Sequence, residues 1–128
     1  MKKMVQILTL IVFMASLTGG MVFAQTDLTG TWIGATEVPD IGEDAITLVL
    51  VKKENTYTGT ITDSAGMAEE AEITDVDFSE GKLTFNFTIY NGSEYMDVAC
   101  ALTVDGNKMT GQWETEDGSS GSIELEKK

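Results

Sequence analysis

The chain has 128 residues, which suits one ordinary domain, and its 21 Asp and Glu against 8 Lys give a formal charge of −13. It contains no Arg and no His, so it has no guanidinium to clamp a phosphate and no imidazole to act as a general base or metal ligand. Such acidity excludes binding to nucleic acid and, once the basic N-terminus is removed, to anionic membranes.

The N-terminus has the form of a secretory signal peptide. Lys2 and Lys3 precede an uncharged apolar run, and Val22 and Ala24 occupy the small-residue positions before a cut. The pattern predicts cleavage after Ala24 and export to the periplasm or the medium, with an uncleaved membrane anchor as the alternative. Residues 25–128 then form one domain of 104 residues. Loss of the two Lys changes its charge from −13 to −15.

The rest of the chain alternates apolar and polar residues between frequent turn signals, which is typical of an antiparallel all-β domain. Asn91-Gly92, Asp105-Gly106 and Asp117-Gly118 are strong hairpin signals, because tight turns need positive φ angles. The predicted strands cover residues 30–38, 45–53, 57–63, 72–78, 82–90, 94–104, 108–114 and 122–127. Eight short strands joined by tight turns predict a closed up-and-down barrel, with a two-sheet β-sandwich as the alternative.

The strand over residues 82–90 shows its inward face most clearly, with an apolar residue at every second position. The predicted inward residues include Leu83, Phe85, Phe87, Ile89, Met96, Val98, Cys100, Leu102, Val104, Met109, Trp113, Ile123 and Leu125. Ile46, Leu48 and Leu50 are expected to add to this set from an earlier strand.

Cys100 is the only cysteine, so it cannot form an internal disulfide. Its position in the apolar alternation predicts a small buried hydrophobic side chain, and no His or basic residue stands nearby to activate the thiol.

A weak internal pattern places a glycine before a large residue in three strands, at Gly30, Gly59 and Gly111. A glycine inside a strand marks a bend or a close approach of two backbones. The recurrence fits strands that curve around a small barrel.

Gly30-Thr31-Trp32 resembles the Gly-x-Trp signature of the lipocalins and related calycin barrels, in which the Trp packs across the closed end. The mature chain also resembles a lipocalin-like domain of secreted bacterial proteins that is often found N-terminal to an α/β-hydrolase. The matching segments are residues 30–34, 57–60, 63–64, 73–78, 81–85 and 110–113. The resemblance implies an eight-stranded lipocalin/calycin-like barrel in a secreted setting, and it transfers no catalytic residues.

Two segments in the first part of the domain also resemble avidin-type biotin binders: residues 28–32 and 57–60. Ile61 stands where that family usually has a Tyr, and the chain has only two Trp with which to wall a biotin pocket. Biotin binding is therefore kept only as a minor alternative.

The sequence gives little support for catalysis or for metal binding. Serines have no His partner, and carboxylate pairs such as Asp75 with Asp77 fall on turns or polar strand faces. The acidic turns at residues 105–107 and 117–120 could supply oxygen ligands to calcium, but they lack EF-hand spacing and match ordinary turn chemistry. The sequence thus predicts no enzyme, no metal and no cofactor, with a carboxylate-dependent enzyme as a further alternative.

Ligand binding remains as the preferred function. The residues predicted to wall a small apolar cavity are Trp32, Trp113, Phe85, Phe87, Met96 and Met109. Met67, in the longest loop, is a candidate to guard its mouth. The same six residues could instead fill a dry core, and the chain would then be an interaction module associated with an exported hydrolase, presenting a patch around Thr47, Val49, Val51 and Tyr90. The oligomeric state is left open.

Overall fold

The computed structural model describes residues 27–128, which form nine antiparallel strands and no helix. The strands are β1 (Gly30–Val38), β2 (Gly42–Lys53), β3 (Thr56–Asp63), β4 (Ala71–Glu72), β5 (Thr74–Ser79), β6 (Lys82–Tyr90), β7 (Tyr95–Asp105), β8 (Lys108–Thr115) and β9 (Ser120–Lys127). Between residues 27 and 128, no helix could cross a membrane. The predicted signal peptide, residues 1–24, lies outside the described residues.

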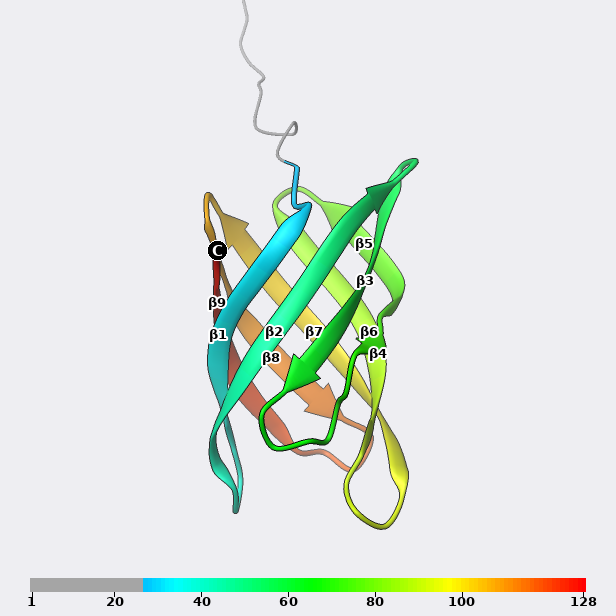
Figure 1. The fold of residues 1–128 in the computed structure, drawn as a ribbon, viewed down its shortest axis with the longest axis vertical. Helices are drawn as coiled ribbons and strands as arrows, with labels where there is room; N and C mark the ends of the chain where they lie inside the picture. Colours follow the sequence, from blue (N-terminus) through cyan, green and yellow to red (C-terminus); the bar gives the residue numbers. More distant parts are fainter. Residues whose placement is uncertain (1–26) are drawn as a thin grey trace, which may run out of the picture.

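The strands form one sheet that curls into a nearly closed barrel (Figure 1). Their order in the sheet is β4-β3-β2-β1-β9-β8-β7-β6-β5. Strands that are consecutive in the chain therefore pair, except β4 and β5 at the two edges, and β1 pairs in addition with β9. That pair runs from Trp32 opposite Lys127 to Thr36 opposite Ile123. The predicted all-β, up-and-down antiparallel barrel is confirmed, and the two-sheet sandwich is not formed.

The structure has nine strands where eight were expected, because the predicted strand 72–78 is divided at Ile73. Its first part, β4, pairs with β3, and its second part, β5, pairs with β6. Ile73 is buried at the crossing and its N–H donates to the carbonyl of Gly59 at 3.1 Å. A bulge between Thr74 and Asp77 bends the chain. This segment therefore crosses the seam between the two edges of the sheet.

The first hairpin is tighter than the sequence indicated. A break was expected over residues 39–44, but β2 begins at Gly42 and its pairing with β1 starts at once, with Val38 opposite Gly42. Asp40 takes a positive φ of 70°, and the Ile41 N–H donates to the Val38 carbonyl at 3.1 Å. As a result, Asp44 lies inside a strand and is buried.

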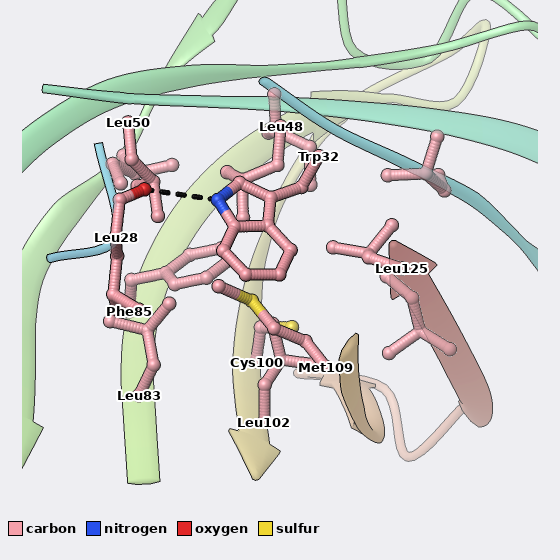
Figure 2. Packing of buried hydrophobic residues seen from close by; sticks show 14 of the residues in the cluster. Leu28, Trp32, Leu48, Leu50, Leu83, Phe85, Cys100, Leu102, Met109 and Leu125 are labelled. Carbon is pink, nitrogen blue, oxygen red and sulfur yellow. Dashed lines mark hydrogen bonds between the residues drawn. The ribbon is translucent and has the colours of Figure 1, made fainter. Parts of the chain in front are cut away.

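The inward alternation is confirmed, and buried apolar side chains pack around Trp32 at the end of the barrel where the chain enters β1 (Figure 2). The side chains buried there include Leu28, Trp32, Leu48, Leu50, Leu83, Phe85, Leu102, Met109 and Leu125, each no more than 3% exposed. The Tyr57 hydroxyl, which accepts a hydrogen bond from the Leu28 N–H, lies beside these apolar side chains, and together they form a packed core at this end of the barrel.

Candidate functional site

The opposite end of the barrel holds a cavity of about 230 Å³. Four connections surround it: the β1–β2, β3–β4, β6–β7 and β8–β9 loops, which lie together at the lower end in Figure 1. The apolar lining residues include Val38, Ile46, Ile61, Met67, Phe87, Ile89, Met96, Val98, Cys100, Trp113 and Ile123. The barrel is thus filled at one end and hollow at the other.

Three of the six predicted ligand residues line this cavity and three do not. Phe87, Met96 and Trp113 face it from β6, β7 and β8. The other three, Trp32, Phe85 and Met109, are 0–2% exposed and belong to the packed end. The two-residue periodicity placed all six side chains on the inner face of the barrel. It does not show which end of the barrel is filled by side chains and which end is hollow. Met67, the predicted mouth residue, does line the cavity.

Two features fix the position of Trp113: a hydrogen bond from its indole N–H, and the absence of a side chain at the neighbouring Gly121. Its Nε1–H donates to Thr36 Oγ1 at 2.7 Å, and the Thr36 hydroxyl donates in turn to the carbonyl of Ser122. A Cβ added to Gly121 would lie 2.7 Å from the Trp113 ring, so only glycine leaves room for it. The indole is therefore fixed in one orientation, half-buried at the cavity wall.

Trp32 closes the other end. Its Nε1–H donates to the carbonyl of Leu28 at 3.0 Å (Figure 2). The Leu28 N–H donates to the Tyr57 hydroxyl at 3.0 Å. The Lys127 ammonium lies 5.6 Å from the centroid of the indole ring. The segment before β1 is thereby fastened across the packed end, which is the position that the calycin resemblance implies for this Trp.

Two buried carboxylates form a polar wall of the cavity. Asp44 of β2 is 2% exposed and Asp63 of β3 is 9% exposed. Asp44 Oδ1 accepts hydrogen bonds from the Ser64 hydroxyl at 3.0 Å and the Ala65 N–H at 2.9 Å. Asp63 Oδ1 accepts from the Ala68 N–H at 2.8 Å, while its Oδ2 is buried without a partner among the described residues.

These two acids were not among the predicted site residues, although the sequence contains a signal for them. Asp44 continues the alternation of Ile46 and Leu48, and Asp63 continues that of Ile61. An acidic residue at the end of an inward-facing register is unusual in a barrel, because a buried carboxylate must be hydrogen-bonded or change its protonation.

Burial raises the pKa of Asp63 from its ordinary value of 3.8 to about 6, and the neighbouring Asp44 carboxyl acts in the same direction. The N–H groups of Ala68 and Met67 oppose this rise in pKa. Below pH 6 a protonated Asp63 can donate to Asp44. At neutral pH Asp63 is mostly ionised, and its buried Oδ2 has no donor in the described part of the protein.

This arrangement predicts that Asp63→Asn stabilises the protein at neutral pH. Between about pH 4 and pH 6 the native state binds more protons at this site than the unfolded state, so the free energy of unfolding falls as pH rises through that window. An Asn amide keeps the bond from Ala68 and adds a donor toward Asp44. Urea titrations should show the variant about 1–2 kcal/mol more stable than wild type at pH 7.5 and nearly equal to it at pH 4.

Asp77→Asn is the matched control for that experiment, because Asp77 is exposed on β5 outside the cavity. It removes the same charge and should give the same stability difference from wild type at both pH values. A pH-independent difference for Asp63→Asn would contradict the shifted titration.

Cys100 also lines the cavity and is a free thiol, 3% exposed. Burial raises its pKa to about 12. The thiol is therefore protonated at neutral pH and acts as apolar wall, in agreement with the prediction of a buried small hydrophobic side chain.

The acidic turn at residues 117–120, considered for calcium, is engaged internally. Asp117 accepts hydrogen bonds from the Thr115 hydroxyl and from the Ser119 N–H, the latter at 3.1 Å. Between residues 27 and 128, no group of three or more Asp, Glu or Cys side chains is placed to hold a metal ion.

The residues expected to form an interaction patch lie together only in part: Thr47, Val49 and Val51 share one face of β2, and Tyr90 lies apart from them. Val51 and Tyr90 are 51% and 44% exposed, but Val51 lies near the packed end of β2, whereas Tyr90 ends β6 at the hollow end (Figure 1). Tyr90 packs instead on Tyr95 of β7, with ring centroids 4.9 Å apart.

No family model and no curated protein matches the chain. Two solved structures resemble it. One is a redesigned β-barrel, mFAP1, bound to DFHBI, with a TM-score of 0.59 and 18% identity over 78% of this chain and 94% of that one. The other is a de novo designed fluorescence-activating β-barrel, with a TM-score of 0.57 and 20% identity over 84% and 100% of the two chains. At this identity the likeness establishes the fold: a small antiparallel β-barrel.

Proposed function

We propose that this chain is an exported, non-enzymatic binding protein that takes a small apolar ligand into the cavity at the hollow end of the barrel. The observation that carries the proposal is the cavity of about 230 Å³, walled by Phe87, Met96 and Trp113 and ringed by four loops. Small-molecule sites typically combine apolar walls with a few placed polar groups, and Thr36, Asp44 and Asp63 supply those here.

The size of the cavity limits the ligand. An apolar protein cavity of about 150 Å³ accommodates benzene, so this one suits a ligand of one aromatic ring with a short substituent. The similar barrel mFAP1 was solved with DFHBI bound, which shows that a barrel of this architecture can hold a small molecule.

The proposals of export and of a lipocalin-like relationship are supported by the amino-acid sequence. Lys2, Lys3 and the small residues before position 25 support a cleaved signal peptide, and residues 30–32 support a lipocalin-like relationship. The absence of His and Arg from the whole chain supports a non-enzymatic role, because it removes the commonest general base and the bidentate anion clamp.

The test is titration of the purified mature protein, residues 25–128, with toluene and with 2-phenylethanol, followed by amide chemical shifts. We expect shifts to concentrate near Met67, Phe87, Met96 and Trp113, and to be absent near Trp32. Saturation at about one hundred times the dissociation constant should raise the free energy of unfolding by about 2.7 kcal/mol.

Met96→Trp provides the decisive variant, since a larger side chain at this half-buried position fills the cavity. It should weaken binding at least tenfold, whereas Val51→Trp on the outer surface should leave binding unchanged. Shifts spread over the outer surface, or equal binding by the two variants, would overturn the proposal.

A further inference from the structure

The cavity is surrounded by negative charge alone. Four carboxylates line it: Asp40 from the β1–β2 turn, Asp44 from β2, Asp63 from β3 and Asp117 from the β8–β9 turn. Of the lining residues, the only other titratable group is the Cys100 thiol, which is neutral, and no Lys is among them. The chain as a whole has no Arg or His that could neutralise these charges.

Most of this charge is satisfied within the protein. Asp44 accepts two hydrogen bonds from the start of the β3–β4 loop, and Asp117 accepts two within its own turn. Asp40 is exposed to solvent in its turn. Asp63 differs, because it lines the cavity and its buried Oδ2 accepts no hydrogen bond from the described residues.

An unpartnered buried carboxylate oxygen is costly, and replacement by Asn would remove the cost without changing the shape of the side chain. Local departures of this kind from a fully satisfied core are expected at functional sites. The missing donor can come from a ligand in the cavity.

We infer that the ligand is a small apolar amine, whose protonated nitrogen donates to Asp63 Oδ2 and whose hydrophobic body packs against Phe87, Met96 and Trp113. The inference rests on the proposed function and names the ligand class for the same cavity. Asp44, two residues from the position opposite Asp63 on the neighbouring strand, adds a second negative charge beside the ammonium.

The same charges argue against fatty acids and other carboxylates, which are natural candidates for an apolar cavity in a barrel. A ligand carboxylate would meet Asp44 and Asp63 in a confined space with no cation among the lining residues. Like charges in a desolvated site repel strongly, so the cavity selects by charge as well as by size.

The test compares three probes that share a phenyl ring and a two-carbon spacer: 2-phenylethylamine, 2-phenylethanol and 3-phenylpropionate. Calorimetric titrations of the mature protein in about 0.15 M salt at pH 7.5 should give the amine an affinity about tenfold to hundredfold higher than the alcohol, with no measurable binding of the carboxylate. Amine affinity should fall as the pH is lowered from 7.5 to 5, because Asp63 takes up a proton, while alcohol affinity stays level.

Asp63→Asn should abolish the preference for amine over alcohol and its pH dependence, while Asp77→Asn, which removes the same charge from the outer surface, should preserve both. Equal affinity of wild-type protein for amine and alcohol would overturn the inference and leave the proposed function standing. Failure of all three probes to bind would overturn both. An amine preference that survives Asp63→Asn would overturn the assignment to Asp63, because general acidity would then attract the cation.

Discussion

Replacement of Trp32 by alanine is expected to lower the free energy of unfolding by about 3–5 kcal/mol. The indole is 1% exposed, fills the packed end of the barrel, and holds the Leu28 carbonyl through its Nε1–H at 3.0 Å. Its removal leaves a cavity among rigid leucines and frees the segment before β1. Chemical denaturation monitored by far-ultraviolet circular dichroism measures the loss.

Trp113→Ala is the matched control, because the same side chain is deleted at the other end of the barrel. Trp113 is half-buried beside space that already exists, so its loss should cost less than half as much stability. The order should reverse for ligand binding, which Trp113→Ala weakens and Trp32→Phe leaves unchanged. Equal destabilisation by the two alanine variants would contradict the division into a packed end and a hollow end.

Gly111→Ala is expected to lower the free energy of unfolding by about 3 kcal/mol or more. A Cβ at this position would lie 1.9 Å from the carbonyl oxygen of Ala101 and 2.9 Å from Leu102 Cα. Both contacts are backbone atoms of the adjacent strand, so no side-chain rotation can relieve them, and the β7–β8 ladder would have to open. Thermal and urea unfolding of the variant provide the measurement.

The control for this prediction is Gly106→Asn, in the turn between β7 and β8. Gly106 has a φ of 64° and nothing within 4 Å of an added Cβ, and Asn accepts such a conformation. This variant should be nearly as stable as wild type. A near-neutral Gly111→Ala would show that the strands have room to separate there.

Gly111 belongs to the glycine pattern seen in the sequence, and the structure explains the pattern for two of its three members. Gly59 and Gly111 each stand opposite a buried leucine on the next strand, and an added Cβ would strike the backbone just before that leucine. Gly34 repeats the arrangement opposite Leu125. These positions let the strands coil tightly enough to close a small barrel.

The candidate site was predictable only in part. The two-residue period placed Phe87, Met96 and Trp113 on the inner face and also placed Trp32, Phe85 and Met109 there, without separating the two groups. The cavity-lining residues can be told from the packed residues only with the register of all the strands, which sets the position of each residue along the barrel axis. Asp63 pairs with Ile46 through the β2–β3 hairpin, whose turn at residues 54–55 the sequence indicated, but its meeting with Asp44 also requires β2 to begin at Gly42, earlier than the sequence indicated.

The sequence by itself determined the strand type, the inward faces, the antiparallel meander and the absence of imidazole and guanidinium chemistry, because each of these follows from composition or from local alternation. Only the tertiary structure decided where the chain crosses the seam at Ile73, which end of the barrel is filled, and that two acids face the empty end. Those features depend on contacts between residues distant in sequence, whose geometry is fixed only when β1 pairs with β9 and the sheet closes.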